Sequence, residues 1–316
     1  MTHKSFAMIV PVLLLLAVLL ALAGCTGTPA RPDSTSTLVP AVPAENITKA
    51  EMKTVPVGDI TIAYKEIGSG EPLILIMGYS GTMDLWDTRL VNQLAQHYRV
   101  IIFDNRGMGN STSSDREYTI RLFAEDTAGL MDALGIKKAH VMGWSMGTFV
   151  AQELTLSYPE KVEKLILYAG TPGGKEALSP APQDIAALTN MTGTDRERGE
   201  RLFGELFPSA WLKENPDPSK YFPRVTEMSA PVNVMRQDAA ILAWNGTSSR
   251  LPALKQPLLL IAGEQDVIAP PGNSLLIAEQ VPQSWVVRIR GGGHGLMYQY
   301  PDEFASIVIT FLEHGT

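Results

Sequence analysis

The chain has 316 residues, of which 45% are hydrophobic and 19% charged, and its formal net charge is −7. This composition is that of a globular protein with a sizeable core, which excludes general disorder. The acidic balance and the absence of any basic block exclude a nucleic-acid partner, because such a surface needs clustered lysine and arginine.

The first segment has the features of an export signal. Lys4 precedes an apolar run over residues 6–23, and the letters LAGC at residues 22–25 end it. This ending resembles the lipobox of prokaryotic lipoprotein signal peptides. The resemblance implies cleavage before Cys25, a lipid on its thiol and a mature protein held at the extracytoplasmic face of the cell membrane. The alternative is an uncleaved anchor, since the run approaches the roughly 20 residues that span a bilayer.

Four parts of the chain are predicted from composition. Residues 1–24 form the signal peptide, and residues 25–50 form a flexible tether rich in Thr, Pro and Ser. Residues 51–171 and 251–316 form one core, and residues 172–250 form a helical cap. Cys25 is the only cysteine, so the chain has no intrachain disulfide and no thiolate metal site.

Within the core, short apolar runs alternate with amphipathic segments. Strands are predicted at residues 61–68, 72–78, 99–105, 137–144, 164–170, 257–263 and 285–290, and helices at residues 86–96, 119–135, 146–159 and 302–314. Because most strands are continuously apolar, they are expected to be covered on both faces. This indicates an α/β fold with a mostly parallel sheet between two layers of helices.

The pattern of strands is interrupted between Thr171 and about Leu254 by helical segments. In the segment over residues 194–207, Thr194 and Glu197 stand at the spacing of a capping box. A helical insertion between two consecutive strands is expected to lie over the ends of the strands as a cap.

The letters HVMGWSMGTFV at residues 140–150 place Ser145 between Gly143 and Gly147, where a predicted strand meets a predicted helix. A serine at such a turn is forced into a strained backbone conformation, and side chains at the two glycine positions would collide with the strand and the helix. The pattern alone is a weak signal, but this context is the one that a nucleophile elbow requires. Ser145 is therefore the candidate nucleophile.

A serine hydroxyl needs a base, and His294 is the best candidate among five histidines. It lies in the glycine-rich letters RGGGHG after the last predicted strand, where a loop can bring the imidazole over the sheet edge. Asp266 follows the preceding strand and is the predicted acid that orients this base, with Glu264 as the alternative.

The order Ser145, Asp266, His294 is that of an α/β-hydrolase. The chain resembles the α/β-hydrolase fold superfamily, in the branch of small capped esterases, lactonases and cofactor-free haloperoxidases. The letters FDNRGMGNS at residues 103–111 match the D-x-R-G-x-G-x-S loop of that branch, and the likeness covers roughly residues 55–314. The resemblance implies an eight-stranded type of sheet with the cap inserted before the strand that carries the acid.

The resemblance also indicates where an oxyanion would be bound. The family commonly carries His-Gly after its second apolar strand, whereas this chain has Met77 and Gly78. The N–H of Tyr79 matches the first oxyanion donor of the family and the N–H of Met146 matches the second. Backbone donors survive a side-chain substitution, so activity is expected in spite of this departure.

With serine at the elbow, we expect acyl transfer on a small carboxylic ester, lactone or thioester, with no metal and no organic cofactor. Carbon–carbon bond hydrolysis, perhydrolysis and a slow ligand-binding sensor remain alternatives, and a structural lipoprotein would leave the three aligned residues unexplained. An apolar acyl site is suggested by residues near the loops and in the cap, although plain core packing is the alternative: Met77, Trp86, Met108, Met146, Trp211, Trp244 and Met297.

Overall fold

The computed structural model describes residues 46–190, 192–224, 227 and 229–315, so the predicted signal, Cys25 and most of the tether lie outside the described residues. Residues 46–50, which we expected to belong to the tether, are folded. Ile47 is 5% exposed, and its N–H donates a hydrogen bond to Asn92 Oδ1 at 2.8 Å. The folded region therefore begins earlier than residue 50, because this apolar side chain joins the core.

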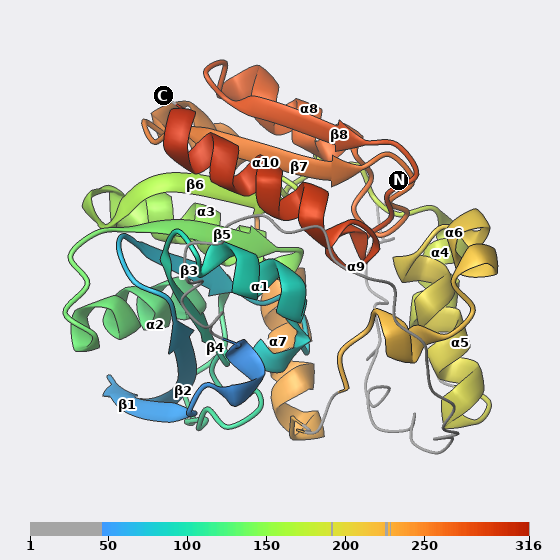
Figure 1. Ribbon diagram of the computed structural model, residues 1–316, viewed down its shortest axis with the longest axis horizontal. Helices are drawn as coiled ribbons and strands as arrows, with labels where there is room; N and C mark the ends of the chain where they lie inside the picture. The colour runs from blue at the N-terminus through green and yellow to red at the C-terminus, as the bar shows by residue number, and fades with distance from the viewer. Residues whose placement is uncertain (1–45, 191, 225–226, 228, 316) are drawn as a thin grey trace, which may run out of the picture.

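An eight-stranded sheet forms the centre of the molecule (Figure 1). Its strands are β1 (Lys53–Val57), β2 (Ile60–Ile67), β3 (Pro72–Ile76), β4 (Arg99–Phe103), β5 (Ala139–Trp144), β6 (Val162–Tyr168), β7 (Leu258–Gly263) and β8 (Trp285–Ile289). The spatial order is β1-β2-β4-β3-β5-β6-β7-β8, and β2 is antiparallel to both of its neighbours while all other pairs are parallel. The predicted mostly parallel α/β sheet is confirmed.

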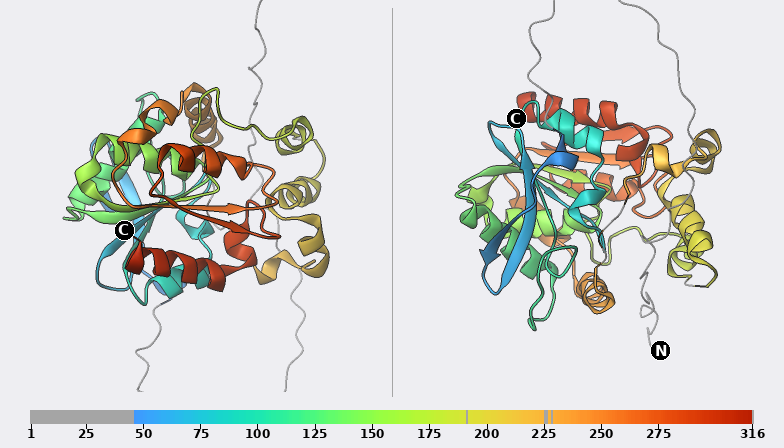
Figure 2. Two further views of the ribbon diagram at one scale, coloured as in Figure 1. Left: turned by 90° about the horizontal axis from the view of Figure 1, so that it is seen from above. Right: turned by 60° about the horizontal axis from the view of Figure 1, so that its bottom comes forward.

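Helices cover both faces of this sheet (Figure 2). The described helices are α1 (Thr88–Leu94), α2 (Ile120–Ala133), α3 (Met146–Ser157), α4 (Pro182–Thr189), α5 (Asp195–Leu206), α6 (Ser209–Glu214), α7 (Pro231–Ala243), α8 (Gly272–Gln280), α9 (Leu296–Gln299) and α10 (Pro301–His314). One face packs against α1 and α10, and the other packs against α2, α3 and α8. None of the described helices is both long and apolar enough to span a bilayer.

Burial explains most of the strands that the sequence predicted, although β8 was predicted from its apolar letters and none of its residues is buried. In β5 and β7 every residue is buried, as their uninterrupted apolar letters indicate. In β1 only Val57 is buried, and Pro56 lies within the strand, which is acceptable at the edge of a sheet. Strand β1 was therefore not predicted from the sequence, and neither was the short helix α8.

In the described part of the chain, the α-helices α4 to α7 lie between β6 and β7, and we call them the inserted helices. Figure 1 shows α4, α5 and α6 beyond the ends of β7 and β8 and α7 apart from them, under the sheet. Helix α5 begins with the capping box: Thr194 and Glu197 exchange side-chain to backbone hydrogen bonds. Helix α7 contacts the loop after β3, because the N–H of Ser80 donates to Gln237 Oε1 at 2.6 Å.

Candidate active site

Ser145 occupies the turn between β5 and α3 in a strained backbone conformation, with φ 54° and ψ −121°. The flanking glycines are sterically required. A Cβ at Gly143 would lie 2.3 Å from the carbonyl oxygen of Gly147, and a Cβ at Gly147 would lie 2.1 Å from that of Ile76. The turn presents the hydroxyl at the N-terminus of α3, where backbone N–H groups favour developing negative charge.

The loop after β3 passes over this serine. A Cβ added at Gly78 would lie 3.2 Å from Ser145 Cβ, so the backbone of the next residue, Tyr79, runs close to the hydroxyl. Among the described residues, neither the N–H of Tyr79 nor that of Met146 has a hydrogen-bond acceptor. Met77 is fully buried, and its carbonyl oxygen accepts from Asn105 Nδ2 at 3.1 Å, which anchors the loop where the family commonly has histidine.

His294 and Asp266 form a buried pair at the carboxyl edge of the sheet. Nδ1 of the imidazole lies 2.9 Å from Asp266 Oδ2 and 3.2 Å from Oδ1. The N–H groups of Ile268 and Ala269 also donate to Oδ1, at 2.9 and 2.8 Å, so the carboxylate is fixed from two sides. The alternative acid, Glu264, instead lies 3.7 Å from Arg288 at the surface.

Two aromatic residues hold the backbone of His294. Its carbonyl oxygen accepts from Tyr168 Oη at 2.5 Å and from Trp144 Nε1 at 3.3 Å. The two rings are stacked, with centroids 6.0 Å apart and planes 9° from parallel. Neither residue was predicted from the sequence, although each is the last residue of its strand and so reaches this edge.

Ser145 and His294 line the same cavity. In the described part of the chain, no hydrogen bond joins Ser145 Oγ to the imidazole. Catalytic hydrogen bonds of this kind are often long in the absence of substrate and shorten in the reacting complex. The structure therefore pairs the base with the acid and brings the serine to the same cavity.

The other described histidines lie elsewhere. His140 is buried in β5 with Nε2 3.1 Å from a Glu71 carboxylate oxygen, and burial lowers its pKa. His97 and His314 lie near Glu313 at the surface. Across the described residues, no three His, Cys, Asp or Glu side chains are grouped so that they could hold a metal ion.

The cavity has a volume of about 550 Å³ and lies between the sheet edge and the inserted helices. Much of its wall is apolar, with contributions from Leu85, Phe149, Ile185, Leu206, Val234 and Ile241. Of the Met and Trp residues expected at an acyl site, Met77, Met146 and Trp244 line it. Trp86 and Met297 belong to the core instead.

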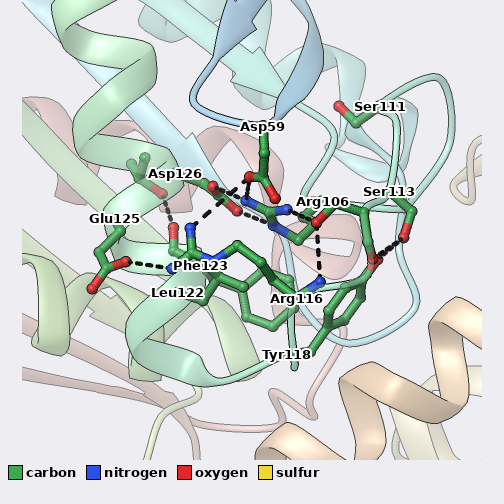
Figure 3. A network of polar contacts seen from close by, with 12 residues as sticks. Asp59, Arg106, Ser111, Ser113, Arg116, Tyr118, Leu122, Phe123, Glu125 and Asp126 are labelled. Atoms are coloured by element: carbon green, nitrogen blue, oxygen red, sulfur yellow. Dashed lines mark hydrogen bonds and ion pairs between the residues drawn. The ribbon is translucent and has the colours of Figure 1, made fainter.

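The loop over residues 103–111 contacts the segment after β3 through Asp104 and Asn105, and Figure 3 shows the network of its arginine, Arg106. The guanidinium of Arg106 is fully buried and makes two hydrogen bonds to Asp126, at 2.6 and 2.7 Å. It also donates to Asp59 at 2.9 Å and to Ser114 at 2.7 Å. This arginine lowers the pKa of Asp59 well below its usual range. The motif that suggested the family is thus a structural anchor for the loop.

Asp104, the first residue of that motif, is fully buried. Its carboxylate accepts hydrogen bonds from the N–H of Met83 at 2.7 Å and of Asn110 at 2.8 Å, yet burial raises its pKa to about 7. A Cβ at Gly109, which has φ +47°, would lie 2.3 Å from Asp104 Oδ2. The glycine of the motif is therefore required by the close approach of this carboxylate.

Comparison with known proteins identifies the family to which this chain belongs. Residues 71–301 match the model of the alpha/beta hydrolase fold family. The chain belongs to this family, as its sequence predicted, and the prediction of a hydrolase with esterase-like relatives is confirmed.

Among individual relatives, the RutD protein of Azorhizobium caulinodans, named as a carbamate hydrolase, is 28% identical over 80% of this chain and 96% of its own length. BpoC of Mycobacterium tuberculosis, named as a non-heme bromoperoxidase, is 30% identical over 80% of this chain and 97% of its own. A thermophilic esterase from Thermogutta terrifontis is a structural relative with a TM-score of 0.69 and 25% identity, covering 84% of this chain and all of its own.

Proposed function

We propose that this protein is a serine hydrolase that cleaves a small carboxylic ester, lactone or thioester through an acyl-enzyme. The observation that carries the proposal is the shared cavity. Ser145, in the strained turn before α3, lines the same cavity as His294, whose imidazole is paired with the buried Asp266. This is the set of groups that acyl transfer through serine requires.

The proposed reaction begins with attack of Ser145 Oγ on the substrate carbonyl, while His294 Nε2 accepts the hydroxyl proton. Asp266 fixes the tautomer with hydrogen on Nδ1 and stabilises the imidazolium. The N–H groups of Tyr79 and Met146 stabilise the oxyanion, and each such donor contributes on the order of 3 kcal/mol to the transition state. The imidazolium then protonates the leaving group, and water releases the acyl group by the same steps.

The cavity supports a small, largely apolar substrate. Its volume of about 550 Å³ lies within the range of small-molecule sites, and its wall combines apolar side chains with a few polar groups. The esterase from Thermogutta terrifontis supports ester hydrolysis as the first reaction to examine.

Perhydrolysis is a second candidate, favoured by the relative named as a bromoperoxidase. The same acyl-enzyme would then be attacked by hydrogen peroxide in place of water. Measuring peracid formation against acid release from one ester separates the two reactions.

Hydrolysis of a short p-nitrophenyl ester tests the proposal. We expect Ser145→Ala and His294→Ala each to lower kcat by at least about a thousandfold, because each removes a member of one catalytic unit. The surface variant His97→Ala is the matched control and is expected to keep wild-type activity. Retained activity in either of the first two variants would refute the assignment.

We also propose that Cys25 carries a lipid that holds the enzyme at the extracytoplasmic face of a prokaryotic membrane. The support is the lipobox-like ending of the apolar segment over residues 6–23. Labelling of growing cells with a fatty-acid probe is expected to mark the wild-type protein and not Cys25→Ser. Equal labelling of both would reject the lipid.

A further inference from the structure

The charged groups that line the cavity are unbalanced. Two carboxylates, Glu227 and Asp238, belong to its wall, and the described lining residues include no lysine or arginine. The one basic side chain there is His294, which must be neutral to act as a base. A cavity with a largely apolar wall has a negative potential when it holds carboxylates that have no partner among the described residues.

Asp238 lies on α7, and its carboxylate makes no hydrogen bond or ion pair with any described residue. It is partly buried, and this burial raises its pKa. Asp238 and Tyr79 both line the cavity, and the pKa of the Tyr79 phenol is raised first by burial and second by the charge of Asp238. Arg236, the only basic residue of α7, is used elsewhere: its guanidinium lies 3.9 Å from the Tyr118 ring centroid and donates to Ser113 Oγ.

Polar atoms without partners line the same cavity. Thr82 is 2% exposed, and its buried Oγ1 has no hydrogen-bond partner among the described residues. The hydroxyl of Tyr79 and one carboxylate oxygen of Glu227 are also buried without a partner. Buried polar atoms are normally hydrogen-bonded, so these three are available to contact a polar or charged group that enters the cavity.

Aromatic rings complete this part of the wall. Phe149 and Trp244 are stacked, with centroids 4.4 Å apart and planes 14° from parallel, and both line the cavity together with Tyr79. Carboxylates combined with aromatic faces bind amines and quaternary ammonium groups, because each attracts positive charge and the rings tolerate the methyl groups.

We propose that the cavity is selective for esters whose acyl or alcohol part carries a cationic ammonium group, with Asp238 as its principal counter-ion and Glu227 as the second. This inference rests on the proposed hydrolase function and names its substrate class. Anionic esters are disfavoured, because their charge would face two carboxylates that have no compensating cation.

Two isosteric pairs of esters test the selectivity. In the first pair, the p-nitrophenyl ester of trimethylammoniobutanoate is compared with the ester in which carbon replaces the nitrogen. In the second pair, the trimethylammonium group and its uncharged carbon isostere are compared in the alcohol part of the ester. For one of the pairs, we expect wild-type kcat/KM to favour the cation by about tenfold, from the ion pair and the ring contacts together.

Variants identify the residues responsible. Asp238→Asn is expected to lower the ratio of cationic to neutral kcat/KM by about fivefold, and Glu227→Gln by less, because Asp238 is the proposed principal counter-ion. Glu205→Gln is the matched control, since Glu205 is a partly buried carboxylate of α5 outside the cavity wall, and it should keep the wild-type ratio. A wild-type ratio of one for both pairs, or an unchanged ratio in Asp238→Asn, would overturn the inference.

Binding to Ser145→Ala protein separates this inference from the proposed reaction. An alkyltrimethylammonium ion is expected to bind more tightly than its uncharged isostere, and to lose that preference when Asp238→Asn is added. If no ester is hydrolysed and this preference is found, the hydrolase proposal fails and the cation site stands. Equal binding of the two ligands overturns the cation site.

Discussion

Three residues other than glycine adopt the left-handed backbone region in the described part of the chain: Ser80, Ser145 and Ala169. They follow β3, β5 and β6, which are neighbours in the sheet, and all three line the cavity. Each such conformation costs about 1–3 kcal/mol. Hydrogen bonds fix each of them, since their N–H groups donate respectively to Gln237 Oε1, the carbonyl of Tyr168 and the carbonyl of Ile261. Backbone strain is thus concentrated at the candidate site.

The elbow glycines allow a test of this local geometry. Gly147→Ala places a Cβ against the carbonyl oxygen of Ile76, so we expect the free energy of unfolding to fall by about 3 kcal/mol or more. In Gly204→Ala, in α5, the added Cβ meets no atom within 4 Å. We expect this substitution to raise the free energy of unfolding by up to about 1 kcal/mol, because alanine favours the helix more than glycine does. Denaturant titration measures both, and equal midpoints for Gly147→Ala and wild type would contradict the steric account.

At the scale of elements, sequence patterns predicted the buried strands well, because a strand that is covered on both faces consists almost entirely of apolar residues. The exposed edge strand β1 carries no such signal, and neither does the short helix α8 behind Pro270 and Pro271. Ser145, Asp266 and His294 were predictable because each follows a recognisable strand. The place of Asp238 in the cavity wall was not predictable from the sequence, because it depends on how the inserted helices pack.

The loop after β4 gives a pH prediction. Burial raises the pKa of Asp104 to about 7, so the folded state binds its proton more tightly than the unfolded chain. The stability that this group contributes is present at low pH and is lost as the pH rises toward the folded pKa. Between about pH 5 and about pH 7, we expect the unfolding free energy of wild type minus that of Asp104→Asn to fall by about 2 kcal/mol.

Unfolding of both proteins across this pH range checks the prediction. Other titrating groups are common to the two proteins, so their effects cancel in the difference. A difference that stays constant with pH would show that Asp104 is already ionised near its ordinary pKa.

At the scale of the whole molecule, segments distant in sequence meet at one edge of the sheet. The turn after β5 supplies the serine, and the loops after β7 and β8 supply the acid and the base. The inserted helices join this arrangement through α5, because the carbonyl of Leu206 accepts a hydrogen bond from the N–H of Gly295, next to His294. The inserted helices therefore contribute both to the cavity wall and to the position of the loop that carries the base.

The central claim is that His294 activates Ser145, and labelling by an uncharged fluorophosphonate tests it most directly, because the reagent needs an activated serine and no particular substrate. We predict rapid labelling of the wild-type protein, with the label on Ser145 in the peptide map, and loss of labelling in Ser145→Ala and His294→Ala. No labelling of folded wild type, or undiminished labelling in His294→Ala, would contradict the account.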